Sequence, residues 1–173
     1  MPFRKIVVAL DLSAASETVW TRALEIARPS QGHLLITHVF FQDDMDLAMI
    51  NGMGYAAAFP LDLWEDYQEH LEAEEARKLK QLRDLVESYP LDGVTVQLQL
   101  KHGIPGQTIC HLAKTWGADL IVLGRRGHSR LEELFLGSVS NYVLHHAPCS
   151  VLAVQGEQPQ TQISSLEGIS QEE

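Results

Sequence analysis

The sequence has few of the features that mark secreted, membrane-spanning or disulfide-rich proteins. Its two cysteines, Cys110 and Cys149, are too few for a disulfide scaffold, and both are expected to be reduced thiols. No apolar run approaches the roughly 20 residues that span a bilayer. No basic segment followed by an apolar stretch comes after Met1, so a cleaved signal is not expected. These absences predict a cytoplasmic protein without a membrane partner.

Positive charge is scarce as well. The net charge is −10, which argues against general nucleic-acid binding, because that function needs a basic surface. From Asp43 to Glu75 there are many acids and no Lys or Arg. The segment from Leu120 to Arg130 has the opposite character, with Arg125, Arg126 and Arg130 and no acid. This strongly positive stretch contains the glycines Gly124 and Gly127.

Several enzyme motifs are missing. The chain has no GxxxxGK[ST], no GxGxxG after its first apolar run and no GxSxG. Its histidines show no metal-ligand spacing such as HExxH, and the adjacent His145 and His146 diverge on a helix. The sequence therefore indicates neither a P-loop NTPase nor a zinc site.

Apolar runs of strand length alternate with segments of helical periodicity. This alternation predicts a single α/β domain with an open parallel sheet and helices on both faces. The third run, VTVQLQL, alternates cleanly and is expected near a sheet edge. The predicted strands are Lys5–Leu10, His33–Phe40, Val94–Leu100, Leu120–Leu123 and Ser150–Val154. A first helix is predicted after Ser13, its N-cap, and a second, long helix from about Leu61. Two further helices are predicted at Thr108–Trp116 and Ser138–His146.

The domain is expected to span residues 1–155. The acidic, Met-rich segment Gln42–Pro60 is irregular and is predicted to be a lid-like insertion. Residues 156–173 are polar and acidic with little to bury, so a disordered tail is predicted.

Two glycine turns suggest an anion site. Gly124 and Gly127 follow the fourth predicted strand, and Gly137 precedes a helix that begins at Ser138. Glycine permits positive φ and lets backbone N–H groups approach phosphate oxygens. The helix start adds free N–H groups, a favourable dipole and the hydroxyls of Ser138 and Ser140. A phosphate chain is the natural ligand of such a site.

Ligands of open parallel sheets bind beyond the carboxyl ends of the strands. Asp11, Val39 and Gly124 all lie at such ends. They are therefore predicted to surround one crevice. Asp11 and Ser138 are also plausible helix caps, a role that does not exclude contact with a ligand.

With these residues in place, the chain resembles the nucleotide-binding branch of the universal stress proteins over about residues 3 to 155. The resemblance depends on Asp11-Leu-Ser13, Thr37-His-Val39 and Gly103-Ile-Pro105. It depends above all on Gly, two residues, Gly, nine residues, Gly and Ser, matched by Gly124, Gly127, Gly137 and Ser138. The insertion Gln42–Pro60 and the acidic tail depart from the family pattern.

The resemblance implies the strand order 3-2-1-4-5, a fold like that of the adenine nucleotide alpha hydrolases. It also implies a homodimer through Ser150–Val154. ATP, or another adenine nucleotide, is the implied ligand, with Mg²⁺ near the phosphates and Asp11 as the metal partner. The implied nucleotide-binding residues are Ala9, Asp11, Ser13, Val39, Gly124, Arg125, Arg126, Gly127, His128, Gly137, Ser138, Val139 and Ser140.

Three functions stay open at this point. The first is a stress-response regulator that holds ATP and signals through its lid or dimer state. The second is a slow ATPase, which is not favoured because no general base is evident beside the phosphate site. The third is a dimeric scaffold that needs no nucleotide. The sequence does not identify a protein partner.

Overall fold

The computed structural model describes residues 2–41, 61–125 and 136–156, with residues 61–68 described by their backbone alone. In chain order its elements are β1 (Lys5–Ala9), α1 (Ser16–Ala27), η1 (Arg28–Ser30), β2 (His33–Phe40), α3 (Leu61–Glu87), β3 (Thr95–His102), α4 (Pro105–Trp116), β4 (Leu120–Gly124), α5 (Ser138–His146) and β5 (Ser150–Val154).

The five strands form one parallel sheet in the order β3-β2-β1-β4-β5. This confirms the predicted fold class and strand order. β1 is central, and its residues Ile6, Val7 and Val8 are completely buried because helices cover both faces. β3 lies at one edge, as VTVQLQL predicts, and its residues are exposed or half-buried, with alternation over the first four.

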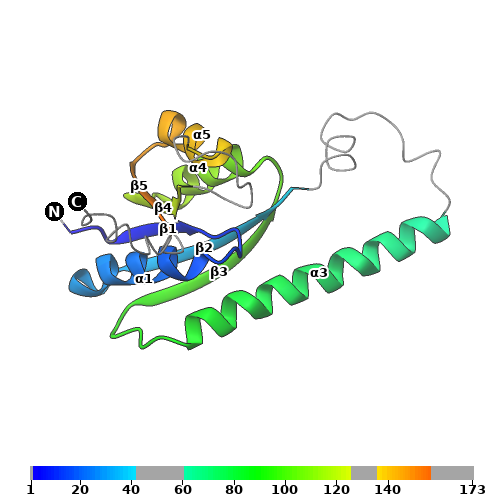
Figure 1. The fold of residues 1–173 in the computed structure, drawn as a ribbon, viewed down its shortest axis with the longest axis horizontal. Helices are drawn as coiled ribbons and strands as arrows, with labels where there is room; N and C mark the ends of the chain where they lie inside the picture. Colours follow the sequence, from blue (N-terminus) through cyan, green and yellow to red (C-terminus); the bar gives the residue numbers. More distant parts are fainter. Residues whose placement is uncertain (1, 42–60, 126–135, 157–173) are drawn as a thin grey trace, which may run out of the picture.

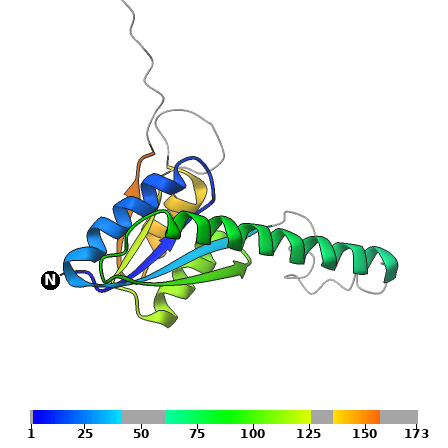
Figure 2. The ribbon, with the colours of Figure 1, turned by 90° about the horizontal axis from the view of Figure 1, so that it is seen from below.

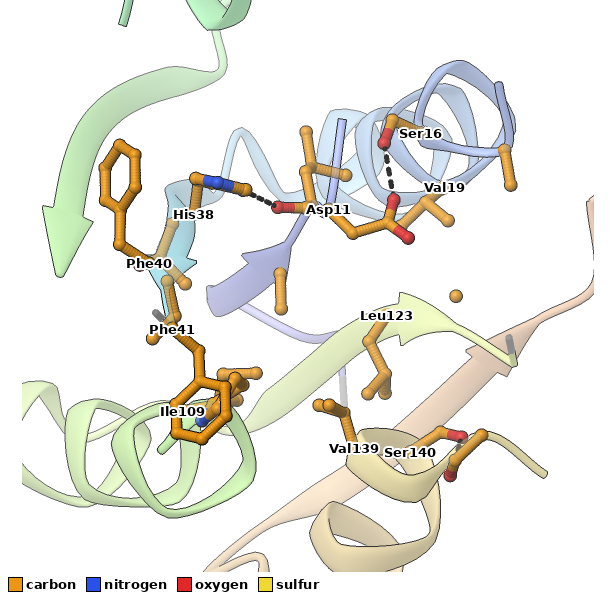
Figure 3. Close-up of a pocket in the computed structure, with 18 of the residues that line it drawn as sticks. Asp11, Ser16, Val19, His38, Phe40, Phe41, Ile109, Leu123, Val139 and Ser140 are labelled. Atoms are coloured by element: carbon orange, nitrogen blue, oxygen red, sulfur yellow. Dashed lines mark hydrogen bonds between the residues drawn. The ribbon is translucent and has the colours of Figure 1, made fainter. Parts of the chain in front are cut away.

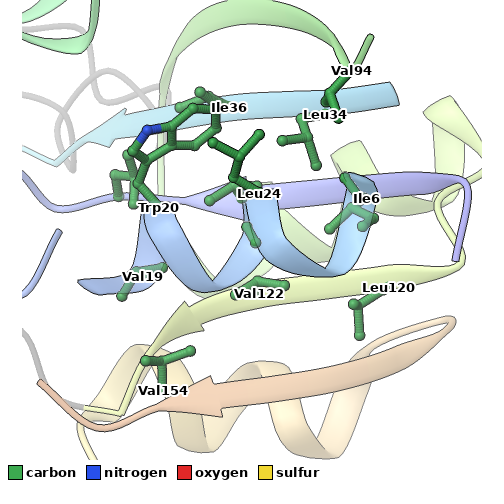
Figure 4. Close-up of a cluster of buried hydrophobic side chains, with 14 of the residues drawn as sticks. Ile6, Val19, Trp20, Leu24, Leu34, Ile36, Val94, Leu120, Val122 and Val154 are labelled. Atoms are coloured by element: carbon green, nitrogen blue, oxygen red, sulfur yellow. The ribbon is translucent and has the colours of Figure 1, made fainter. Parts of the chain in front are cut away.

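Helices cover both faces of the sheet, α1 and α3 on one and α4 and α5 on the other (Figures 1 and 2). Each face has its own apolar core, since alternate side chains of a strand point to opposite faces. The core beneath α1 includes Ile6, Trp20, Leu24, Ile36 and Val122 (Figure 4). The core beneath α4 and α5 includes Val7, Ile109, Ile121 and Val143.

The long helix α3 packs on the sheet through its C-terminal half and extends past the sheet at its N-terminal end (Figure 1). Leu82 is completely buried, and Leu85 and Val86 pack against the same core. One to two turns earlier the same side of the helix carries Glu74 and Lys78, which are half-buried. The inner side of α3 is therefore charged near the middle of the helix and apolar towards its C-terminal end.

Two helix starts differ from the predictions. Ser13 is not the N-cap of α1, which begins at Ser16 with Ala15 in the cap position and no side-chain cap. The Asp11 carboxylate binds the N–H of Ser13, and the positive φ of 61° at Leu12 turns the chain there, so the helix begins later. α4 begins at Pro105 rather than Thr108, because proline suits the first helical turn.

Both cysteines are free thiols, as predicted, and burial raises the pKa of Cys110 and of Cys149. Within the described ranges, no helix is both long and apolar enough to cross a bilayer. The predicted lid Gln42–Pro60 and the predicted tail from residue 157 onward lie outside the described residues.

Candidate functional site

A cavity of about 470 Å³ lies at the carboxyl ends of β1, β2 and β4 (Figure 3). Residues from α1, α3, α4 and α5 complete its wall. Its volume falls in the range of about 300–1,000 Å³ that is typical of small-molecule sites. Its position is the one expected for a ligand site of an open parallel sheet.

Most of the residues predicted for the nucleotide site lie in the wall of this cavity. They are Ala9, Asp11, Val39, Gly124, Gly137, Ser138, Val139 and Ser140. Ser13 and Arg125 are described but do not line the cavity. Arg126, Gly127 and His128 lie outside the described residues.

Asp11 forms the boundary between β1 and α1. Its Oδ1 accepts hydrogen bonds from the Ser13 N–H at 3.0 Å and from the Ser16 hydroxyl at 3.1 Å (Figure 3). These bonds hold the carboxylate in the cavity wall beside α1. Ser13 itself does not line the cavity, and its hydroxyl accepts the Ala15 N–H at 3.3 Å.

The end of β2 presents backbone groups to the cavity. Ala9 is level with Thr37, and the Leu10 N–H donates to the Thr37 carbonyl at 2.9 Å. Because alternate residues of a parallel strand bond to opposite neighbours, Val39 directs its N–H and C=O towards the same side as Thr37. In this register Val39 is level with Asp11, which lies beyond the end of β1. The backbone of Val39 therefore faces the cavity mouth.

The opposite wall is built where β4 leads towards α5. The Arg125 N–H donates to the Val154 carbonyl at 2.7 Å, and the Gly137 N–H donates to the Arg125 carbonyl at 2.9 Å. The first backward helical bond of α5 runs from the Asn141 N–H to the Gly137 carbonyl at 2.9 Å. The N-cap residue of this helix, Gly137, supplies no side-chain cap. The N–H groups of its first turn are therefore donors for an anion.

Two details of this wall differ from the sequence predictions. The Ser140 hydroxyl donates to the carbonyls of Arg125 and Gly137, at 2.8 and 2.9 Å, so it fastens the turn instead of pointing a donor at a ligand. Gly124 is not among the described glycines with positive φ, which are Gly93, Gly103 and Gly117. Any benefit of glycine at position 124 is therefore space rather than a left-handed backbone.

Sequence reasoning missed the contribution of α3 to the cavity. Glu74 and Lys78 both line it. Glu74 is paired with Arg77 at 2.6 Å, and this bond lowers the pKa of the Glu74 carboxyl. The sequence does carry a sign of this contact. Residues 74, 75 and 78 are charged although they lie on the side of the helix that later carries the core residues Leu82 and Leu85.

A row of aromatic rings at the end of β2 was missed as well. His38 and Phe40 line the cavity, and their ring centroids are 5.0 Å apart in an edge-to-face contact (Figure 3). Phe40 also stacks on His102 at 5.1 Å, and His102 hydrogen-bonds Glu75 at 2.6 Å. The His38 Nδ1 lies 2.8 Å from the Leu10 carbonyl. These contacts join the ends of β1, β2 and β3 to α3.

The cavity has few groups able to hold a metal ion by themselves. Within the part of the chain that the structure describes, no three His, Cys, Asp or Glu side chains come close enough to hold one. Among the described residues, Asp11 and Glu74 are the carboxylates in the cavity wall. Mg²⁺ bound to a nucleotide is coordinated mainly by phosphates and water and needs only one or two protein carboxylates. Asp11 fits that limited role.

The sheet order and the cavity at the carboxyl edge define an α/β protein of the doubly wound class with a candidate small-molecule site. Within that class, the chain belongs to the universal stress protein family, whose model matches residues 2–155. A universal stress protein of Synechocystis sp. is 39% identical over 155 residues, which cover 90% of this chain and 99% of that protein.

Solved structures show the same fold. A universal stress protein in complex with cAMP has a TM-score of 0.58 and 22% identity, covering 90% of this chain and 98% of its own. A universal stress protein family protein from Arabidopsis thaliana with AMP bound has a TM-score of 0.58 and 21% identity, covering 93% of this chain and 97% of its own.

Proposed function

We propose that the cavity binds an adenine nucleotide and that the protein is a regulator that responds to its occupancy. The observation that carries the proposal is the start of α5, where the N-cap residue Gly137 supplies no side-chain cap, and which lines the same cavity as Asp11 and the backbone of Val39. This arrangement offers anion donors on one side and base-pairing backbone groups on the other. Two structural neighbours contain AMP or cAMP, which supports an adenine ligand.

The proposed pose follows the chemistry of the walls. The base lies against the N–H and C=O of Val39, and the ribose lies near Asp11. The phosphates lie at Gly124, Gly137, Ser138 and Val139, where the first-turn N–H groups of α5 donate to their oxygens. In an ATP complex, Mg²⁺ would offset phosphate charge with Asp11 as its protein ligand.

We propose that the protein binds the nucleotide as a regulator and does not act on it as an enzyme. The start of α5 supplies hydrogen-bond donors, and such donors hold phosphates without activating water. We infer that the signal is passed on through the acidic segment 42–60 or through a homodimer formed by β5. A slow ATPase and a nucleotide-independent scaffold are the other outcomes that an experiment must separate.

The test is calorimetric titration of nucleotide-stripped protein with AMP, cAMP and ATP, the last with and without Mg²⁺. We expect saturable binding of at least one of them, with ATP binding strengthened by Mg²⁺ because the protein carries a net charge of −10. Absence of binding at millimolar concentrations of all three ligands would reject the proposal and leave the scaffold.

A phosphate-release assay with ATP distinguishes a nucleotide-binding regulator from an ATPase. If wild-type protein releases phosphate from ATP and Asp11→Ala does not, the protein is an ATPase. Equal low release from both proteins indicates contamination and agrees with a regulator.

A further inference from the structure

Thr37 lines the cavity and carries a buried hydroxyl that has no partner in the described part of the chain. The residue lies on β2 and is 0% exposed. Its Oγ1 has no hydrogen-bond partner among the described residues. Thr37 also lines the cavity, beside Ala9 of β1 and on the same side of β2 as Val39.

A hydroxyl at this position brings no benefit to the folded chain by itself. The neighbouring strand residues Leu34, Leu35 and Ile36 are buried and apolar, and valine would fill the space of Thr37 with the same branched shape. Burying a hydroxyl without a partner is unfavourable because its hydrogen bonds to water are lost. The position is therefore explained best by a partner that the described residues do not supply.

An unpaired group alone is not a binding site. The indole N–H of Trp20 is also buried and unpaired, yet Trp20 lies in the apolar core beneath α1 and does not line the cavity. Thr37 differs because it adjoins space large enough for a ligand. The cavity, rather than the missing bond, is what makes Thr37 a candidate.

We propose that the hydroxyl of Thr37 hydrogen-bonds the adenosine part of the nucleotide, at the polar edge of its base. This inference rests on the proposed function and adds a side-chain contact to it. Thr37 and Val39 are two residues apart on β2, about 6.6 Å along the strand. A planar base against Val39 has its inner edge near Thr37, where the hydroxyl either donates to a ring nitrogen or accepts from an amino group.

The experiment compares wild type with Thr37→Val and Thr37→Ser. Valine removes the hydroxyl at constant shape, whereas serine keeps it. We expect Thr37→Val to bind AMP and ATP about tenfold more weakly, by the same factor for both, since one neutral hydrogen bond to the shared adenosine part is lost. Thr37→Ser retains most of the affinity. Thr95→Val, at an exposed position on β3, is the matched control and should bind as wild type does.

Thermal unfolding without ligand gives a second readout. Thr37→Val should unfold at the same temperature as wild type or higher, because an unpaired buried hydroxyl has been removed. Equal affinity of Thr37→Val and wild type would overturn the contact while leaving the proposed function intact. A loss for ATP alone would also overturn it, because the contact would then involve phosphates. If wild type binds neither AMP nor ATP, both the function and the contact are rejected.

Discussion

Gly137, the N-cap residue of α5, has no side chain that would keep a ligand away from the start of this helix. The residue has φ −62° and ψ 157°, an extended conformation open to any amino acid. The backbone therefore does not require glycine here. The remaining reason for glycine is space for the ligand.

We predict that Gly137→Val lowers the affinity for ATP by roughly tenfold or more, because its branched side chain occupies the place proposed for the phosphates. The melting temperature should change by only a few degrees, about the effect of a helix-cap substitution. Titration and thermal unfolding measure the two effects. Unchanged affinity would show that the phosphates are bound elsewhere.

Gly106 is also required for space, but inside the protein. A Cβ at this position would lie 2.7 Å from a ring carbon of Tyr142, closer than packed atoms approach. We predict that Gly106→Ala destabilises the protein by about 1–3 kcal/mol, because α4 and α5 must separate to admit the methyl group. Urea denaturation measures the loss, and adding Tyr142→Leu should recover part of it. A variant as stable as wild type would show that this contact adjusts without cost.

At the scale of elements, α3 is where sequence reasoning was least complete. Its length and apolar stripe were readable from Leu71, Leu79, Leu82 and Val86. Its contact with the cavity was not, because that depends on how the helix crosses the sheet beside β3. A charged residue on the inner side of a helix is a local sign of a polar cavity, and Lys78 gives that sign.

We predict that Lys78→Met weakens ATP binding by about two- to fivefold at low salt and less at high salt, because a positive charge in the cavity wall attracts the polyphosphate. Lys80→Met is the matched control, since Lys80 is exposed and pairs with Asp84 at 2.7 Å. Titration at two salt concentrations measures both variants. Equal effects of the two substitutions would mean that only net charge matters.

The turns around the site show what a sequence pattern can and cannot give. The positions of Asp11, Val39 and Gly124 at the carboxyl ends of predicted parallel strands were enough to place all three in one cavity. The hydrogen bond of the Ser140 hydroxyl could not be predicted from the sequence. Its acceptor, the Arg125 carbonyl, is 15 residues away along the chain and comes near Ser140 only in the folded structure. The unpaired Thr37 was likewise hidden, because the sequence shows a strand residue and not its partners.

At the scale of the whole molecule, the fold was predictable because its signals are strong and repeated. Buried parallel strands read as continuous apolar runs, as in Lys5–Ala9, and each is followed by a helical period. Right-handed crossovers then leave few topologies. Dimer formation depends on surface residues and does not follow from these patterns. The surface that the family resemblance indicates is the edge of the sheet at β5.

The register of β5 allows a direct test of that edge. The Val154 carbonyl bonds the Arg125 N–H on the β4 side. Because bonding alternates along a parallel strand, the backbone N–H groups of Val151 and Ala153 point away from β4, towards the free edge. Proline lacks this N–H and is tolerated at an edge strand. Ala153→Pro therefore removes an edge donor without removing a bond to β4.

We predict that wild-type protein is a dimer in sedimentation equilibrium and that Ala153→Pro shifts it towards monomer with its circular dichroism unchanged. Leu152→Pro is the contrasting variant, because its N–H points towards β4, and it should lower the melting temperature by removing a bond within the sheet. A dimer that survives Ala153→Pro must use a surface other than β5. A wild-type monomer at all concentrations would reject the dimer itself and leave nucleotide occupancy to act within a single chain.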